Sequence, residues 1–262
     1  MKKYILLLGV LVMLAVFAAC SNDEPTAPKP LESVGEKVFD AIEIENQKHI
    51  SVTNDSGGIY IYGYPNQDVI ETLLYRTVSA EAKKLAEQRL GDIELQHRKT
   101  ENNIDIFATI DTQPGGLNYT SWYSLDMPNN MVVDITAIWD DINIFDMDTT
   151  LTVTDAKRNI SVVRHSGSTQ LTTLAGDIYV EIAMPDSGYC IAETGAGDIV
   201  VRVPQETSAR IELVSQSGSV TVNNLEVNDQ VEQSGSLSGV LGLGEGEITL
   251  ATNRGAIVLN GF

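Results

Sequence analysis

A repeat of roughly twenty residues in the second half of the chain constrains the fold more than any other feature. The triplets Gly176-Asp177-Ile178, Gly197-Asp198-Ile199 and Gly218-Ser219-Val220 are separated by 21 residues each time. The isoleucines Ile142, Ile160 and Ile178 are separated by 18 residues. A constant period of this length is typical of a solenoid, in which one structural unit stacks on the next.

Within each unit, apolar residues alternate with polar ones, as they do in a β-strand with one buried face. Ile178, Val180 and Ile182 would face the interior, whereas Tyr179 and Glu181 would face solvent. The glycine of each triplet allows the backbone to turn a corner, and the Asp or Ser that follows can close the turn by a side-chain hydrogen bond. The outward positions that could form a binding face include Thr172, Tyr179, Glu181, Arg202, Arg210 and Glu212.

These features predict an all-β fold, a right-handed parallel β-helix or solenoid of about six or seven coils in which each coil stacks on the one before. An antiparallel β-sandwich is the alternative, because it also uses short alternating strands with frequent turns. Three later copies are spaced more closely, which predicts narrower coils toward the C-terminus; they are Gly235-Ser236-Leu237, Gly246-Glu247-Ile248 and Gly255-Ala256-Ile257.

Residues 37–125 are predicted to form a cap of strands and one helix. This cap would cover one end of the solenoid, and the solenoid itself would occupy residues 126–262. The open ends of solenoids need such covers. The helix is predicted to start at an N-cap Ser79 and to end at Gly91. Strands are predicted at 50–52, 59–62, 69–78, 93–97 and 104–110, with a hairpin turn at 100–103.

The first twenty residues resemble the signal of bacterial lipoproteins. Lys2 and Lys3 precede an apolar run from Ile5 to Val16, which is too short to span a bilayer comfortably, and the run leads to Cys20. The resemblance implies a signal peptide at 1–19, lipidation of Cys20 and a proline-containing tether at 20–36. The mature protein would then be exported and anchored to a membrane by its N-terminal lipid, with the outer membrane or the cell surface as the expected location.

Charge and cysteine content narrow the possible partners. Without residues 1–19 the chain has 15 basic and 36 acidic side chains, so its formal charge is −21. This balance excludes nucleic acid as a partner and favours cations or basic partners.

Cys190 would be the one cysteine left for pairing, so no disulfide is expected. Cys190 is interpreted as a small buried apolar residue.

Residues that could support catalysis or metal binding are few, and neither a catalytic residue nor a metal or cofactor is predicted. His49, His97 and His165 lie in different predicted strands without neighbours at metal-ligand spacing. Two pairs of acids could bind calcium or act on a polysaccharide, as in β-helical carbohydrate-active enzymes, and a third pair could bind calcium. They are Asp140 with Asp141, Asp146 with Asp148, and Asp177 with Asp198; a role in forming turns is favoured for the last pair.

Exposed aromatic side chains are the better candidates for ligand binding. Tyr119, Trp122 and Tyr123 occupy a segment, residues 113–124, that is predicted to be a loop before the repeats. Tyr and Trp stack on sugars and anchor protein contacts. The alternative is that Trp122 and Tyr123 pack over the first coil as part of the cap.

The repeats and their surroundings resemble a bacterial β-solenoid family labelled "putative adhesin", a domain of unknown function. The resemblance rests on Gly57-Gly58-Ile59-Tyr60-Ile61, Met127-Pro128 and the rung Thr194 to Val201, and it covers about residues 38–262. The resemblance implies the solenoid fold more firmly than it implies a function. We therefore expect a non-enzymatic envelope lipoprotein whose binding face contacts a surface polysaccharide or another envelope protein. An envelope scaffold or sensor partner, or a β-helical carbohydrate-active enzyme, is the alternative.

Overall fold

The computed structural model describes residues 31–54, 56–110, 117–137 and 139–262. The chain divides into two units, residues 1–31 and Glu32–Phe262, and the second unit is described below. The predictions of a signal peptide, of a lipidated Cys20 and of most of the tether fall on residues 1–30 and lie outside the described residues.

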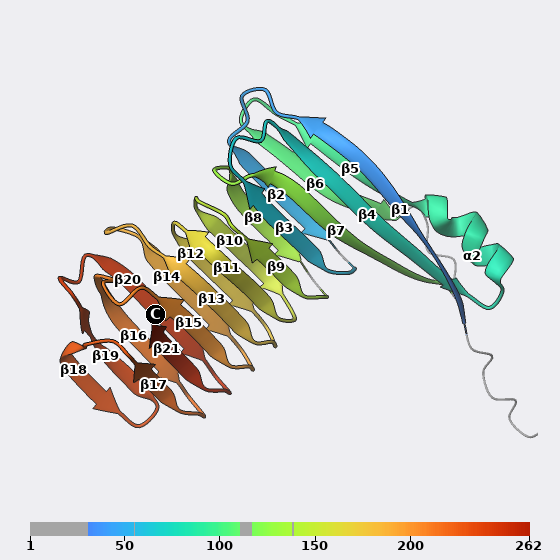
Figure 1. Cartoon of the computed structure of the whole chain (residues 1–262). Helices are drawn as coiled ribbons and strands as arrows, with labels where there is room; N and C mark the ends of the chain where they lie inside the picture. The colour runs from blue at the N-terminus through green and yellow to red at the C-terminus, as the bar shows by residue number, and fades with distance from the viewer. Residues whose placement is uncertain (1–30, 55, 111–116, 138) are drawn as a thin grey trace, which may run out of the picture. The chain divides into compact units, whose positions relative to one another are not determined.

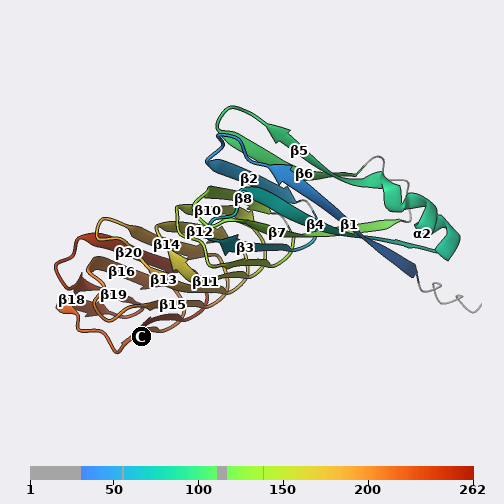
Figure 2. The ribbon, with the colours of Figure 1, turned by 45° about the horizontal axis from the view of Figure 1, so that its top comes forward.

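Two β-sheets form the unit Glu32–Phe262, and their apolar inner faces enclose one core (Figures 1 and 2). Sheet A contains β1 (Glu32–Glu43), β3 (Ile59–Tyr64), β4 (Val69–Ala80), β7 (Asn118–Pro128), β9 (Ile142–Phe145), β11 (Ile160–Ser166), β13 (Ile178–Ala183), β15 (Ile199–Val203), β17 (Val220–Asn223) and β21 (Ile257–Gly261). Sheet B contains β2 (His49–Asn54), β5 (Ile93–Lys99), β6 (Asn103–Ile110), β8 (Val132–Ala137), β10 (Leu151–Ala156), β12 (Thr169–Thr173), β14 (Tyr189–Thr194), β16 (Ala209–Ser215), β18 (Asn228–Gln233), β19 (Ser236–Leu241) and β20 (Gly246–Thr252).

The sheets are largely parallel because the chain passes repeatedly from a strand of sheet B to the next strand of sheet A. Each such pair of strands is called a rung, and neighbouring rungs pair in parallel in both sheets. This arrangement confirms a mostly β, solenoid-like fold and contradicts the antiparallel sandwich. In their spatial order, the rungs in the described residues are β6–β7, β2–β3, β8–β9, β10–β11, β12–β13, β14–β15, β20–β21 and β16–β17, numbered 1 to 8.

The order of the rungs differs from the sequence order near both ends of the stack. Rung 7, β20–β21, is the last part of the chain, yet it lies between β14–β15 and β16–β17. Ile257 pairs with Ile199 on one side and with Val220 on the other. At the opposite end, β2–β3 is inserted between β6–β7 and β8–β9. The expectation that each coil stacks on the one before is therefore correct for rungs 3 to 6 and wrong at the ends.

The prediction of narrower C-terminal coils is also wrong. Gly246 and the segment after Gly255 begin the two strands of a single rung of ordinary width, which explains their close spacing. Gly235 has a different role, because it lies at the turn of the antiparallel hairpin formed by β18 and β19. This hairpin extends sheet B beyond β16 and covers that end of the stack.

Side chains at one corner tie successive rungs together. Each Asp or Asn before a sheet A strand accepts, through its Oδ1 atom, the backbone N–H of the equivalent residue in the next rung. The N···O distances are 3.1 Å from Asn159 to Asp141, 2.8 Å from Asp177 to Asn159, 2.8 Å from Asp198 to Asp177 and 2.7 Å from Ala256 to Asp198. Asp177 and Asp198 therefore bond between rungs, whereas the sequence had suggested a bond within each turn.

A second row of hydrogen bonds runs through the interior of the same corner. Hydroxyl groups at the ends of sheet B strands donate to backbone carbonyl groups of the preceding rung. Thr173 donates to Arg158, Thr194 to Gly176, Thr252 to Gly197 and Ser215 to Gly255, with O···O distances of 2.7 to 3.0 Å. Because buried hydroxyl groups are costly when unpaired, these bonds make the polar inner corner compatible with the apolar core.

The core itself consists of the inward residues of both sheets, mostly Ile, Val and Leu. Cys190 is among them, and burial raises the pKa of its thiol to about 12, which agrees with its interpretation as a small apolar residue. His165 is an exception, because its side chain is 2% exposed in this apolar setting. Its Nε2 atom lies 3.4 Å from the carbonyl oxygen of Ser168.

The wide end of the stack is closed by antiparallel strands and the helix (Figure 1). β4 pairs with β7, β1 pairs with β4, and β5 pairs with β6. The helix α2 spans Lys83–Arg89 and is followed by a 3-10 turn, η1, at Leu90–Asp92. Ser79 is not its N-cap, because pairing between β1 and β4 continues to Ala80, and the hydroxyl groups of Ser79 and Ser33 bond to each other. In the described part of the chain, no helix is long and apolar enough to cross a membrane.

We predict that Gly255→Ala destabilises the unit strongly. Gly255 has a φ of +147°, and a Cβ atom there would lie 1.9 Å from the carbonyl oxygen of Gly197 in the neighbouring rung. We expect a loss of about 2–4 kcal/mol in the free energy of unfolding, measured by urea denaturation. Gly91→Ala is the matched control, because a Cβ there meets no atom within 4 Å, and it should change stability by less than about 0.5 kcal/mol. Equal effects of the two substitutions would contradict the packing of rung 7 against rung 6.

Stability should also fall as the solution becomes acidic, partly through His165. Burial lowers the pKa of this imidazole below its ordinary 6.5, so the unfolded chain takes up a proton more readily than the folded one. The free energy of unfolding should therefore decrease as the pH drops from about 6.5 toward the folded-state pKa. His165→Met should have a shallower dependence over this range when urea denaturation is repeated at several pH values. Parallel curves for the two proteins would show that His165 makes no contribution.

Candidate functional site

The three aromatic residues singled out in the sequence lie on a strand and not in a loop. Residues 118–124 belong to β7, which pairs with β4 on one side and with β3 on the other. Since side chains alternate along a strand, Tyr119 and Tyr123 point inward and Trp122 points outward. The loop prediction for residues 118–124 is wrong because long-range strand pairing fixes this segment; residues 111–116 lie outside the described residues.

Tyr119 and Tyr123 take part in packing at the wide end. Tyr123 is fully buried, and its hydroxyl group donates to the carbonyl oxygen of Thr53 at 3.5 Å. The half-buried Tyr119 donates to Oδ2 of Asp92 at 2.9 Å, and burial together with this bond raises the pKa of its hydroxyl group. For Tyr123 the geometry matches the alternative of packing within the cap, whereas Trp122, named in the same alternative, points outward.

Trp122 belongs to a cluster of large side chains on the outer face of sheet A. This cluster, called the aromatic platform, consists of Leu73, Tyr75, Trp122, Tyr60, Tyr62 and Phe145, from β4, β7, β3 and β9. The Trp122 ring lies 5.9 Å from Tyr60, at an interplanar angle of 67°, and 5.3 Å from Tyr75. The rings of Tyr62 and Phe145 stack at 5.1 Å with an angle of 9°. Aromatic contacts at these separations are favourable and hold the rings in fixed orientations.

A hollow of about 510 Å³ opens between these side chains. It is lined by Gly58, Tyr60, Tyr62, Leu73, Trp122, Ser124, Asp140 and Asp141. Strand register explains the hollow, because Ser124 pairs with Leu73 on one side and with Tyr60 on the other. The short serine side chain leaves space between two large neighbours. The volume lies within the range of small-molecule sites, roughly 300–1,000 Å³.

Carboxylates border the platform. Asp140 and Asp141 come from the turn before β9, and Oδ1 of Asp140 accepts the backbone N–H of Asp141 at 2.8 Å. Beside the hollow, Asp126 pairs in register with Tyr62 and with Glu71. Burial, and then the charge of Glu71, raise the pKa of Asp126, while burial also raises the pKa of Tyr62. The site therefore combines aromatic rings with acceptors of hydrogen bonds.

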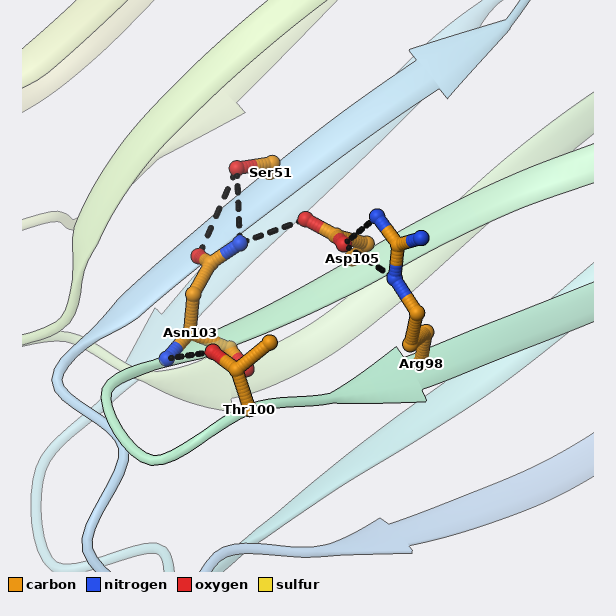
Figure 3. Close-up of polar contacts among 5 residues, drawn as sticks. All are labelled: Ser51, Arg98, Thr100, Asn103 and Asp105. Carbon is orange, nitrogen blue, oxygen red and sulfur yellow. Dashed lines mark hydrogen bonds and ion pairs between the residues drawn. The ribbon is translucent and has the colours of Figure 1, made fainter.

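The outer face of sheet B at the same end of the stack is polar. Figure 3 shows Arg98 and Asp105 facing each other across β5 and β6, with an N···O distance of 2.7 Å. Asn103 bonds both to Asp105 and to Ser51 on β2. These polar groups satisfy one another, whereas the ring–ring contacts given for the described residues lie on sheet A.

The outward residues proposed from the sequence point outward but are divided between the two sheets. Tyr179, Glu181 and Arg202 lie on sheet A, where Arg202 bonds to Glu181 at 2.6 Å. Thr172, Arg210 and Glu212 lie on sheet B. They therefore cannot form one continuous polar face.

In the remaining acidic pair, Asp146 and Asp148, the first carboxylate is bound by Arg164. Asp146 follows β9 with a φ of +58°, and both of its carboxylate oxygens bond to Arg164 at 2.6 Å. Asp148 lies in an isolated bridge with Ser166, so the two acids do not share a strand face as expected. Over the described residues, no group of three or more His, Cys, Asp or Glu side chains is placed to hold a metal ion.

Most of the platform was missed in the sequence, although one signal was present. Tyr60 and Tyr62 alternate with Ile59 and Ile61, which places both tyrosines on the outer face of one strand. Their neighbours on β4, β7 and β9 depend on strand order, and that order departs from the sequence. Asp140 and Asp141 were noted as a pair, but their place beside Trp122 was not.

Comparison with known proteins gives a family and weak structural likenesses. The family model described as "Toastrack DUF4097" matches residues 32–260. A "putative cell adhesion protein" from Clostridium sporogenes ATCC 15579 matches with a TM-score of 0.49 and 10% identity, over 87% of this chain and all of that chain. A "putative adhesin" from Bacteroides fragilis NCTC 9343 matches with a TM-score of 0.39 and 11% identity, over 87% of this chain and 97% of that chain. No curated protein gives a match.

Proposed function

The chain belongs to the Toastrack DUF4097 family, and we propose that it is a non-enzymatic cell-envelope lipoprotein whose solenoid-like unit presents a binding face. The match to the family model spans nearly all of the described residues, but the family is one of unknown function. The proposal therefore depends on the side chains of this chain. The right-handed winding of the solenoid is part of the same proposal.

The hollow in the aromatic platform is the observation that carries the proposal. Trp122, Tyr60 and Tyr62 line it together with two carboxylates, and Trp122 is held between two other rings. Flat aromatic faces beside hydrogen-bond acceptors suit the ring of a sugar, which has an apolar face and a rim of hydroxyl groups. A surface polysaccharide is therefore the proposed ligand, and Trp122 is the proposed contact residue in place of the inward Tyr119 and Tyr123.

The proposed location is supported by the sequence of the leader. Cys20 follows a short apolar run, and 11 residues lie between it and Glu32; the predicted tether at 20–36 is too long at its C-terminal end, because β1 already starts at Glu32. A lipid on Cys20 would anchor the unit to a membrane without a transmembrane helix.

A second candidate function is that of an envelope scaffold or sensor partner. It is favoured by Trp139 and Leu174, which are 61% and 66% exposed. Lys157 lies over the Trp139 ring at 3.8 Å. Trp is enriched among the residues that contribute most to binding in protein interfaces. Co-purification of one protein in a fixed ratio, lost in Trp139→Ala, would favour this candidate.

Removal of Trp122 tests glycan binding directly. We predict that Trp122→Ala weakens binding of an N-acetylglucosamine hexamer about 5- to 10-fold, measured by isothermal titration calorimetry, because a stacking contact is lost. Trp122→Phe should retain part of the affinity. Trp139→Ala is the matched control, since it removes another outward Trp, and it should bind like the wild type. Similar losses in both Trp-to-Ala variants, or no binding by the wild type, would contradict the proposed face.

Protease treatment of intact cells tests the location. We expect the unit Glu32–Phe262 to be cleaved before the cells are lysed, because a surface lipoprotein is accessible from outside. Cys20→Ser should release the protein from the membrane fraction, since the anchor depends on lipid at this residue. Full protection of the wild type until lysis would argue against adhesion and would favour an internal scaffold.

A further inference from the structure

We infer that the hollow in the aromatic platform selects glycan rings that carry a free, protonated amino group and discriminates against uronic acids. This inference rests on the proposed function, because it specifies the ligand of the same site. It follows from the charges around the hollow, from the free carboxylate oxygens and from the arrangement of the rings.

The charged groups at the hollow are all acidic. Asp140 and Asp141 line it, and no Lys or Arg is among its lining residues. Asp126 and Glu71 extend the acidic border along the same face. An anionic sugar placed there would be repelled by several carboxylates, whereas an ammonium group would be attracted.

Two lysines come from elements that adjoin the platform. Lys37 pairs in register with Tyr75, at the side of the platform formed by β1 and β4. Lys157 belongs to the turn before β11, and its ammonium group lies over the Trp139 ring. Neither residue lines the hollow. In the described residues, no basic side chain lines the hollow, and neither Asp140 nor Asp141 forms an ion pair.

The two lining carboxylates are oriented by the fold and still have an oxygen to offer. Oδ1 of Asp140 accepts the N–H of Asp141, and Oδ1 of Asp141 accepts the N–H of Asn159 in the next rung. In the described residues, Oδ2 of each carboxylate accepts no hydrogen bond from the protein. An amino group can donate up to three hydrogen bonds and would form charge-assisted bonds with such oxygens.

The rings favour the same ligand. The Trp122 ring is fixed by Tyr60 and Tyr75, so little conformational entropy is lost when a ligand packs on it. The face of Trp or Tyr also attracts a cation within about 6 Å of its centre. A glucosamine ring can therefore satisfy the apolar surface, the carboxylates and the aromatic faces at once, whereas a uronic acid satisfies only the apolar surface.

The test compares three hexamers of equal length, namely glucosamine, N-acetylglucosamine and galacturonic acid. Titration calorimetry is done at about pH 6, below the range of roughly 7.7–8.0 in which an α-amino group titrates, so that the sugar amines are largely protonated. We expect glucosamine to bind about tenfold more tightly than N-acetylglucosamine, and galacturonic acid not to bind measurably. The preference should shrink when salt is raised to about 0.5 M, because ionic attraction is screened.

A charge-removing variant separates this inference from the proposed function. In Asp140→Asn/Asp141→Asn the Oδ1 acceptors remain while both charges are lost, so the glucosamine preference should fall to about twofold or less. Glu193→Gln/Glu212→Gln is the matched control, because it removes two charges from sheet B, and its preference should equal that of the wild type. Thermal unfolding of both variants verifies that they are folded.

Each outcome has a distinct meaning. Binding of both amino and N-acetylated hexamers with equal affinity, or a preference that persists in Asp140→Asn/Asp141→Asn, would overturn the inference and leave the proposed function in place. An equal loss of preference in the control would overturn it as well, because the effect would then arise from overall charge. If no hexamer binds, the proposed function fails with it.

Discussion

The close approach of neighbouring rungs at one corner is the constraint on which the structure depends. At Gly197 and Gly255 a Cβ atom would lie within about 2.1 Å of a carbonyl oxygen in the adjacent rung. Only glycine permits this spacing at these two positions, where the backbone N–H groups of Asp198 and Ala256 bond to Asp177 and Asp198 of the previous rung. The corner thereby fixes both the distance between rungs and their register.

A fixed register has a direct consequence for the outer faces. Because residues in equivalent positions of successive strands lie side by side, their side chains form columns across sheet A. Tyr62 and Phe145 stack in this way, and the short Ser124 leaves a hollow between larger neighbours. The candidate site thus depends on the same strand pairing that stabilises the fold, and it needs no loop to position its side chains.

At each end of the stack, one rung is inserted between two others, so the spatial order of the rungs differs from the sequence order. The last strands of the chain, β20 and β21, form hydrogen bonds on both sides, since each lies between two other strands of its sheet. β16 pairs with β20, and β17 pairs with β21, so both strands need rung 7 in place, although rung 7 follows them in the sequence. β20 and β21 are therefore internal strands of the stack, although they follow β16 and β17 in the sequence.

The sequence predicts the local structure better than the order of the rungs. Period-two alternation identified Ile178, Val180 and Ile182 as inward residues, and they are buried. Strand order could not be predicted, because the glycine corners at 197, 218 and 255 offer similar partners and only global packing decides among them. For the same reason the loop assigned to Trp122 was wrong and the neighbours of Tyr60 were missed. Ser79 was assigned as an N-cap on local preference, but pairing with β1 extends the strand past it.

The central claim is that the outer face of sheet A around rungs 1 to 3 is the binding face. Mapping of backbone amide chemical shifts during titration with a glucosamine hexamer tests it most directly. The account predicts that the shifts concentrate on β3, β7 and the turn before β9, around Tyr60, Trp122 and Asp141. Shifts confined to sheet B, or to the hairpin formed by β18 and β19, would contradict it.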